Sequence, residues 1–478
     1  MKTIGIAVIG WGFMGRTHTH ALRSIPMMYP GIDFQPVLKC VCSRREAPAR
    51  EAMELLGFES YTTDWRTILT RDDIDVVSVC TPNALHEEMA IALLKAGKHV
   101  YLDKPMAVTL DSARRIAAAA RESGAYSQMV MNNRFLPATM RAKQLAEEGA
   151  LGEIIGFHAQ YLHSGSVDEA RPIGWKQEAQ GGVILDLASH ALDLVTDICG
   201  FPKRVMCAAN TLYASRPTKT GGVETDLSED HAILTLRMPN GALGTVEASK
   251  IATGTNDEMG FEIYGKKGAL KFDLMEPGWL WYFDNTVPEA PLGGRRGFTR
   301  IECMARYPAP AGTFLPPKNA IGWDRGHIHC YYSFLDCVAH GKAPRPSIED
   351  GLKLQAVLAA AADSARTGNW TDVPETQNTV SRIPHFSGCA AHGKSSRPST
   401  NDGLKPQAVL PARTIGRMQR TTRARRVPGG STAAIPFPAA RRTAKAPRPS
   451  IGDGLKPQAV LAAMDSARTG DWTDVPKM

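Results

Sequence analysis

Apolar and amphipathic segments alternate through the first 130 residues of the chain. Short apolar runs predict strands over 4–9, 37–42, 76–80, 99–102 and 127–131. Amphipathic runs between them predict helices over 15–25, 47–56, 86–96 and 110–123. Strands separated by helices of this length are typical of βαβ units. We therefore expect an α/β domain with a parallel sheet over residues 1–131.

After about residue 150, strand-like stretches follow one another directly. They cover 154–161, 204–212, 231–237, 242–251, 260–265 and 269–273. Turn sequences such as Pro239-Asn240-Gly241 separate them, which indicates an antiparallel sheet rich in hairpins. Helices are predicted over 182–196, 328–340 and 347–367. The pattern predicts an α+β domain with a mostly antiparallel sheet over residues 132–377.

The last hundred residues repeat an earlier block. The sequence around 340–358 recurs near 392–410 and again near 445–457. Leu354 of the first block is replaced by Pro406 and Pro457 in the two copies, and an interior proline costs a helix about 3 kcal/mol. We predict that the folded part ends near Pro374 and that 378–478 is a basic, repeat-containing, disordered tail.

The net charge of +8 is concentrated in this tail, which has 17 basic and 5 acidic residues, so residues 1–377 are mildly acidic. This distribution argues against a nucleic-acid partner. No run approaches the ~20 apolar residues that span a membrane. The nine cysteines form no CxxC pair, which favours free thiols in a cytoplasmic protein. The isolated tract 327–330 (HIHC) offers no second ligand group, so we expect no metal site.

A glycine-rich sequence directly follows the first predicted strand and opens the first predicted helix: Gly10-Trp11-Gly12-Phe13-Met14-Gly15. In a βαβ unit this G-x-G-x-x-G pattern indicates a dinucleotide-binding Rossmann domain. Gly10 would permit the tight turn, Gly12 the close approach of a pyrophosphate, and Gly15 close helix packing. The alternative is a glycine-rich turn that binds nothing.

The cofactor's ribose end is predicted from the end of the second strand. Asp33 lies about twenty residues past the loop, where an acidic ribose contact is usual, but it precedes that strand. The strand ends at Ser43-Arg44, where a hydroxyl beside a guanidinium suits a 2′-phosphate. We therefore expect NAD(P), with NADP(H) favoured over NAD(H).

Three further segments occur in a characteristic order: 81–86 (TPNALH), 103–105 (DKP) and 181–193 (GGVILDLASHALD). With the glycine loop they resemble the Gfo/Idh/MocA family of oxidoreductases, from residue 1 to about 375. The usual Glu-Lys-Pro is here Asp103-Lys104-Pro105, one methylene shorter. The resemblance implies an NAD(P)-dependent enzyme for a sugar, sugar derivative or cyclitol. It also implies a homodimer or homotetramer that pairs through an open sheet in the second domain.

The resemblance assigns roles to individual residues. The catalytic set would be Lys104, Asp186 and His190. Further cofactor contacts would come from Thr81, Asn83, His86, Asp103 and Lys104. Substrate contacts would come from Asn132, Arg134 and Trp175, together with Asp186 and His190. Packing in the core is the alternative for Trp175.

The chemistry of the catalytic set agrees with these roles. Asp186, His190 and Asp193 have i, i+4 and i+7 spacing, which places them on one face of a helix. Oxidation of a secondary alcohol needs a base, and a histidine suits that task. Lys104 would share the proton or stabilise the alkoxide. Asp186 would orient His190 or bind a substrate hydroxyl.

Two other functions use the same fold. One is a glycosidase that oxidises a sugar carbon transiently with bound NAD, and the other is a non-catalytic regulator that senses a dinucleotide. The presence of both Lys104 and His190 argues against the regulator, because a sensor has no need of proton transfer.

Overall fold

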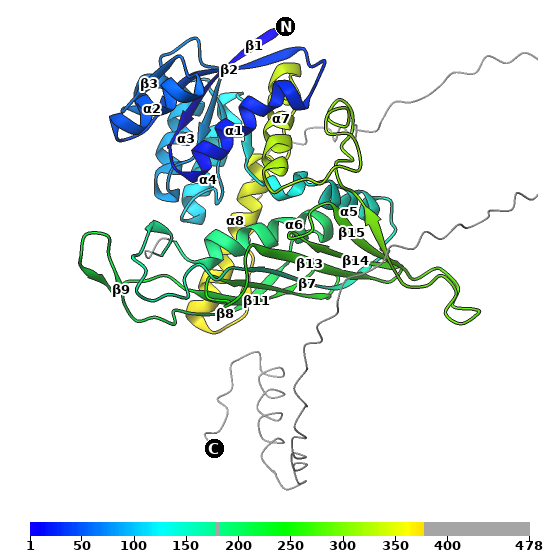
Figure 1. The fold of residues 1–478 in the computed structure, drawn as a ribbon. Coiled ribbons are helices and arrows are strands. Elements are labelled where there is room, and N and C mark those ends of the chain that lie inside the picture. The colour runs from blue at the N-terminus through cyan, green and yellow to red at the C-terminus, as the bar shows by residue number, and fades with distance from the viewer. Residues whose placement is uncertain (178–180, 377–478) are drawn as a thin grey trace, which may run out of the picture. The chain divides into compact units, whose positions relative to one another are not determined.

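The computed structural model describes residues 1–177 and 181–376, which form a parallel sheet and a larger mixed sheet, each covered by helices (Figure 1). The tail predicted over 378–478 lies outside the described residues. The predicted two-part fold class is confirmed, with a Rossmann-type sheet first and a mostly antiparallel sheet second.

The first sheet has the strand order β3-β2-β1-β4-β5-β6, and all its neighbours are parallel. Its strands are β1 (Lys2–Ile9), β2 (Phe34–Cys42), β3 (Ser60–Thr62), β4 (Val76–Val79), β5 (His99–Leu102) and β6 (Ser127–Met129). The chain runs outward from β1 through β2 to β3, and then crosses over to β4 on the other side of β1. The crevice above the end of β1 is therefore the usual ligand position of such a sheet.

Both faces of this sheet are buried. Ile4, Ile6 and Val8 of β1 pack on one face, and Ala7 and Ile9 on the other. Burial on both sides explains why the strands are apolar runs without alternation. The predicted strands and helices all occur here, and the short β3 is an additional strand.

Helices from both ends of the chain complete this layer. The helices of the nucleotide-binding part are α1 (Phe13–Met28), α2 (Glu46–Leu56), α3 (His86–Lys95) and α4 (Leu110–Ser123). The late helix α7 (Asp324–His340) packs beside α1 and buries Ile328, Tyr331 and Phe334 in the same core as Ile4 (Figure 1). The sequence pattern predicted α7 as a helix but not its place against the first sheet.

The second sheet has the order β16-β15-β14-β13-β7-β12-β11-β8-β17. Its strands are β7 (Ile154–Leu162), β8 (Arg204–Asn210), β11 (His231–Arg237), β12 (Leu243–Ser249), β13 (Glu258–Gly265), β14 (Gly268–Asp273), β15 (Trp279–Asp284), β16 (Phe298–Glu302) and β17 (Thr371–Asp372). A small separate hairpin pairs β9 (Arg216–Pro217) with β10 (Val223–Glu224). The pair β7 and β12 is parallel, in contrast to the other pairs of the large sheet.

One face of the large sheet is covered and the other is open. The covering helices are α5 (Pro137–Glu147), α6 (Ser189–Cys199) and α8 (Ile348–Thr367). In β11 the buried Ala232, Leu234 and Leu236 alternate with exposed positions such as Ile233. The open face carries further exposed apolar side chains, among them Leu243 and Trp281. This alternation is typical of an antiparallel sheet with one solvated face.

The sequence pattern missed α5, β15 and β16. Helix α5 begins at Pro137, a favoured first helical residue, but its buried positions are mostly small or polar, such as Ala138, Thr139 and Ala142. Its weak apolar stripe explains why the pattern did not reveal it.

Candidate active site

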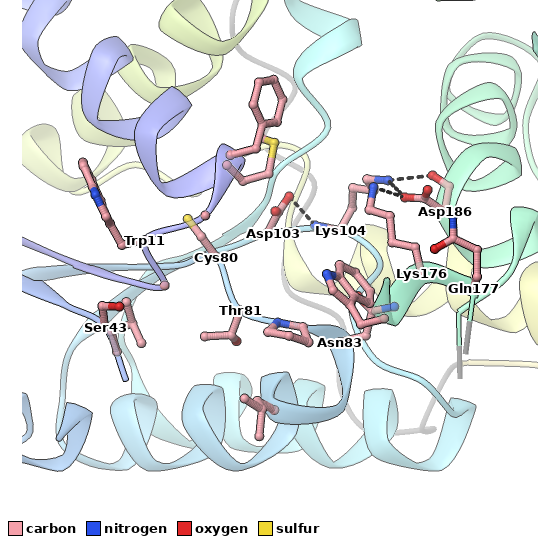
Figure 2. A pocket seen from close by; sticks show the side chains of 18 of the residues that line it. Trp11, Ser43, Cys80, Thr81, Asn83, Asp103, Lys104, Lys176, Gln177 and Asp186 are labelled. Carbon is pink, nitrogen blue, oxygen red and sulfur yellow. Dashed lines mark hydrogen bonds and ion pairs between the residues drawn. The ribbon is translucent and has the colours of Figure 1, made fainter. Parts of the chain in front are cut away.

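A cavity of about 1240 Å³ is lined by both parts of the fold. This exceeds the usual ~300–1,000 Å³ of a site for one small ligand. Figure 2 shows Ser43 and Trp11 at one end, and Asp186 with its lysine partners at the other. We call the first end the cofactor half and the second the substrate half.

The glycine loop forms the cofactor half by its backbone shape. Gly10 has φ +98°, and a Cβ there would lie 2.5 Å from the carbonyl oxygen of Cys80. A Cβ on Gly15 would lie 1.9 Å from the carbonyl oxygen of Gly10, so the helix and loop are in close contact. A Cβ on Gly12 would meet no atom within 4 Å, and Gly12 lies on the cavity wall. The loop therefore has room for a ligand beside Gly12, whereas Gly10 and Gly15 are packed against backbone atoms.

The start of α1 suits an anionic ligand. Gly12 is its N-cap and supplies no side-chain cap, and the first turn contains no acidic residue. The free N–H groups and the helix dipole then favour a phosphate. Phe13 and Met14 also line the cavity, and the Phe13 ring stacks on Trp323 at 5.7 Å. These features fit the pyrophosphate of a dinucleotide.

The end of β2 forms the cavity wall where a ribose is expected. Ser43, Arg44 and Arg45 line this wall, and the described residues that line it here include no carboxylate. Asp33 lies elsewhere, where its carboxylate contacts His340 at 3.2 Å. Asp33 is therefore not among the residues that line this wall.

Thr81, Asn83 and Asp103 also line the cavity, but His86 does not. The His86 ring is fully buried, with Nδ1 3.0 Å from the carbonyl oxygen of Pro105 and Nε2 2.9 Å from that of Thr81. The structure therefore places the His86 ring, predicted as a cofactor contact, behind the cavity wall and not on it. The His86 ring lies between the two loops that carry Thr81 and Lys104, and its single N–H can donate to either carbonyl oxygen.

Lys104 and Asp186 meet in the substrate half (Figure 2). The ammonium group of Lys104 donates to the Asp186 carboxylate at 3.0 Å and to its backbone oxygen at 2.6 Å. Two lysines that the sequence did not reveal contact the same carboxylate, Lys176 at 2.8 Å and Lys250 at 3.4 Å. Lys250 directly follows β12, between Ser249 and Ile251, and a lysine at the end of a half-buried strand is the signal that was available in the sequence.

Burial and charge act together on these groups. Burial alone would raise the pKa of Asp186, but the three ammonium groups outweigh it and hold that pKa well below its usual range. Burial lowers the pKa of Lys104, and Lys176 lowers it further, although Asp186 opposes the shift. Burial and then Lys104 hold the pKa of His190 well below its usual range. The site therefore combines an ionised carboxylate with a neutral imidazole and an amine whose pKa is lowered.

His190 is oriented by Asn133 and not by Asp186. The Asn133 amide lies 3.3 Å from Nδ1 of His190, while the hydrogen bonds of Asp186 go to lysines. Because the Asn133 N–H donates to Nδ1, the neutral ring carries its hydrogen on Nε2. Among the described residues, Asp186 makes no hydrogen bond to His190, so the structure gives no contact for the expected orienting role.

The predicted single helical face is only partly correct. Asp186 lies in a π-helical segment (Ile184–Ala188), and α6 begins after it at Ser189. Asp186 and His190 line the cavity, whereas Asp193 does not. A π turn contains more residues than an α turn, so the i, i+4, i+7 rule does not apply across it.

Asn132 and Arg134, predicted as substrate contacts, are not among the residues that line the cavity. Arg134 donates two hydrogen bonds to Asp193, at 2.5 and 2.8 Å, and one to Asp197 at 2.8 Å. Asn132 is buried and donates to Asn133 at 3.0 Å. Both residues fix the segment that positions Asn133 beside His190.

Trp175 lines the cavity and is 39% exposed, so it does not pack in the core. A second polar group on the cavity wall was missed. Asp257 accepts a hydrogen bond from Tyr161 at 2.8 Å and contacts Nε2 of His163 at 2.9 Å. Tyr161 lies at the end of β7 and His163 directly follows that strand, and polar residues at a strand end are the signal that was available.

The described residues were also searched for a group of metal ligands and for a membrane-spanning helix. Within residues 1–177 and 181–376, no three histidine, cysteine or acidic side chains come together as metal ligands. His329 contacts the Tyr29 hydroxyl at 2.8 Å, and the His327 ring packs on Trp323. No helix in the described ranges is long and apolar enough to cross a membrane.

Known proteins match this chain over both parts of the fold. Residues 4–131 match the model of an oxidoreductase family with an NAD-binding Rossmann fold, and 139–271 match the GFO/IDH/MocA C-terminal domain. Levoglucosan dehydrogenase of Pseudarthrobacter phenanthrenivorans is 32% identical over 391 residues, covering 78% of this chain and 99% of the relative.

Two further comparisons are informative. A solved complex of levoglucosan dehydrogenase with NADH and levoglucosan is 32% identical, with a TM-score of 0.74, over 78% of this chain and 100% of that one. A scyllo-inositol 2-dehydrogenase (NADP(+)) of Bacillus subtilis is 29% identical, covering 77% of this chain and 95% of the relative. The two family models, the long relatives and the glycine loop lead to one conclusion. This chain belongs to the Gfo/Idh/MocA family of NAD(P)-dependent oxidoreductases.

Proposed function

We propose that the protein oxidises a secondary alcohol of a sugar, sugar derivative or cyclitol, or reduces the corresponding ketone, with NAD(P). The observation that carries this proposal is the contact between Lys104 and Asp186 beside His190, in the same cavity as the glycine loop. Relatives named for levoglucosan and scyllo-inositol support this substrate class. A bound nicotinamide would supply the hydride acceptor at the carbinol carbon.

Lys104 is the proton acceptor in this proposal. Its lowered pKa makes the neutral amine accessible, and Asp186 fixes the position of its nitrogen. His190 would donate its Nε2–H to the substrate oxygen, because its Nδ1 already accepts a hydrogen bond from Asn133. Sequence chemistry assigned the base role to His190, and the hydrogen bond from Asn133 favours Lys104 instead. Trp175, Tyr161 and Asp257 would contact the remaining substrate hydroxyls.

NADP(H) is the cofactor that we favour. Ser43 and Arg44 lie on the ribose wall, and the described lining residues there include no acidic side chain that would repel a 2′-phosphate. The pyrophosphate would lie at Gly10, Gly12, Phe13 and Met14, and Thr81, Asn83, Asp103 and Lys104 would line the path to the nicotinamide.

We also propose the organisation of the protein. The nucleotide-binding domain would cover 1–131 and the substrate and oligomerisation domain 132–377. The open face of the large sheet, with exposed Ile233, Leu243 and Trp281, would pair subunits into a homodimer or homotetramer. The free thiols of Cys40, Cys42, Cys80 and Cys207 support a reducing, cytoplasmic compartment.

The proposed function is tested with purified protein, NAD⁺ or NADP⁺, and a panel of inositols, aldoses and anhydrosugars. We expect reduced cofactor to form with at least one of them. Cofactor binding without formation of reduced cofactor, together with unchanged behaviour of Lys104→Ala, would contradict the proposal and favour a dinucleotide-sensing regulator. Release of free sugar from a glycoside, without net cofactor reduction, would favour the glycosidase.

A further inference from the structure

The helical segment that carries Asp186 begins without a side-chain cap of its own. Val183, which precedes the π-helical turn Ile184–Ala188, supplies no such cap, and α6 follows that turn directly. The N–H of Asp186 donates to the backbone oxygen of Gly182 at 3.0 Å, and this bond closes the first turn. The N–H groups of Val183 and Ile184 precede that bond. Such first N–H groups of a helix need partners from elsewhere.

Glu229 supplies both partners. Its Oε1 accepts the N–H of Ile184 at 2.9 Å, and its backbone oxygen accepts the N–H of Val183 at 3.2 Å. A carboxylate in this position also interacts favourably with the positive end of the helix dipole. A Cβ on Gly182 would lie 2.2 Å from Oε1 of Glu229, so the glycine leaves the room that the carboxylate needs. Glu229 therefore caps this segment from a distant part of the chain.

The residues on either side of Glu229 contact two lysines of the substrate half. The backbone oxygen of Asp230 accepts the N–H of Lys250 at 2.9 Å. The hydroxyl of Ser228 donates to the backbone oxygen of Lys176 at 3.4 Å, and the Lys250 ammonium donates to the same oxygen at 3.2 Å. Residues 228–230, just before β11, therefore connect three segments of the substrate half that are separate in the sequence.

Glu229 is not among the residues that line the cavity, so any effect on the reaction passes through the groups that it holds. Asp186 lies two residues after Ile184, the residue whose N–H Glu229 accepts. The Lys104 ammonium donates to the Asp186 carboxylate at 3.0 Å and to the Asp186 backbone oxygen at 2.6 Å. Because one of these acceptors belongs to the backbone, a displacement of the capped segment also displaces the Lys104 nitrogen.

We infer that Glu229 is a positioning residue for the proposed reaction, and that it acts by capping the helical segment that holds Asp186 against Lys104. This inference rests on the proposed function, because the role of Lys104 as proton acceptor belongs to that proposal. The alternative is that Glu229 acts through its charge. Burial lowers the pKa of Lys250, and Asp186 and then Glu229 oppose that shift, so the Glu229 charge also acts on the substrate half.

Two conservative substitutions separate the reach of the side chain from its charge. Glu229→Gln keeps the length and an oxygen acceptor but removes the charge, whereas Glu229→Asp keeps the charge and is one methylene shorter. Hydrogen exchange of a peptide over 181–190, measured in the full chain with its cofactor, reports the cap without turnover. We expect exchange about fivefold faster in Glu229→Asp and close to wild type in Glu229→Gln. Asp226→Asn, at an exposed position of the same loop, is the control.

Turnover provides the second measurement. With the sugar or cyclitol that the wild type oxidises best, we expect kcat to fall by about 10²-fold in Glu229→Asp, because a small displacement of a catalytic group is enough for a loss of this size. Glu229→Gln should retain most of kcat, and the cofactor Kd should be nearly unchanged in both variants. A general loss of stability, by contrast, would weaken cofactor binding together with turnover.

Three results would each overturn the inference. They are wild-type exchange in Glu229→Asp, wild-type kcat in Glu229→Asp, and losses in Glu229→Gln as large as those in Glu229→Asp or larger. The last result would assign the effect to the charge of Glu229.

The outcomes also distinguish this inference from the proposed function. Wild-type behaviour of Glu229→Asp in an enzyme that reduces its cofactor would overturn only the inference. The expected difference in exchange, in a protein that reduces no cofactor with any member of the substrate panel, would support the cap and overturn the proposed dehydrogenase activity.

Discussion

The cofactor half of the cavity is formed by backbone and small residues, whereas the substrate half is formed by charged side chains from separate segments. Gly10, Gly12 and Gly15 lie within six residues of one another. Lys104, Asp186 and Lys250 are brought together from three distant parts of the chain. The cofactor half therefore depends on local chain geometry, and the substrate half depends on the packing of one domain against the other.

The largest effect is expected where the substrate half loses its central charge. Asp186→Asn leaves the ammonium groups of Lys104, Lys176 and Lys250 without a described carboxylate partner. We expect the free energy of unfolding in urea to fall by about 3 kcal/mol. Turnover should fall by about 10³-fold because Lys104 is no longer positioned. Asp72→Asn, at an exposed position, is the control, and equal losses in both variants would contradict the account.

The next change affects only the cofactor half. A Cβ on Gly12 meets no protein atom within 4 Å, so Gly12→Val should leave the unfolding midpoint nearly unchanged. The valine would occupy the space expected for the pyrophosphate, and we expect the cofactor Kd to rise by about 100-fold. Gly10→Val, by contrast, should destabilise the fold because of its φ of +98°. Unchanged cofactor affinity of Gly12→Val would show that the pyrophosphate lies elsewhere.

These two halves also differ in how far the sequence predicts them. The glycine loop is recognised from six residues between a predicted strand and a predicted helix. All of these lie in one short stretch of sequence, so a local pattern is enough to predict the loop. Lys104, Asp186 and His190 were found through their family motifs. Lys176 and Lys250 belong to none of those motifs, and the ion pairs of Arg134 with Asp193 and Asp197 become visible only after folding.

The same distinction applies to the fold. The strands of the first sheet are buried on both faces, so each is a clear apolar run, and all the predicted ones occur. The packing of α7 against α1 joins segments that are 300 residues apart, and a local pattern has no record of such contacts. The parallel pairing of β7 with β12 is likewise a property of topology and not of either strand.

A smaller effect is expected at the ribose wall. In the double variant Ser43→Asp and Arg44→Ala, a carboxylate repels the 2′-phosphate and a cationic donor is lost. We expect the ratio of kcat/KM for NADP⁺ to that for NAD⁺ to fall by about tenfold or more. Titration of both cofactors checks this, and an unchanged ratio would place the 2′-phosphate pocket away from β2.

The smallest effect is expected from removing the repeat-containing tail. Levoglucosan dehydrogenase, which this chain matches over 99% of its length, corresponds to only 78% of the chain. Truncation after Glu375 should leave the unfolding midpoint and kcat/KM unchanged within error. A loss of folding or of activity would show that residues beyond 375 contribute to one of the two halves.

The account as a whole depends on Lys104 as the group that accepts the substrate proton. Because the neutral amine is the active form, kcat/KM for oxidation should rise with pH and level off above the Lys104 pKa, which burial and Lys176 lower. Lys176→Met removes a nearby positive charge, so it should raise that pKa and shift the rise to higher pH.

The most direct test is the pH profile of kcat/KM for the wild type, Lys176→Met and Lys104→Met, with the cofactor Kd measured in the same samples. The account predicts an upward shift in Lys176→Met and a loss of about 10³-fold in Lys104→Met, with cofactor binding nearly unchanged. An unshifted profile in Lys176→Met together with substantial turnover by Lys104→Met would contradict it.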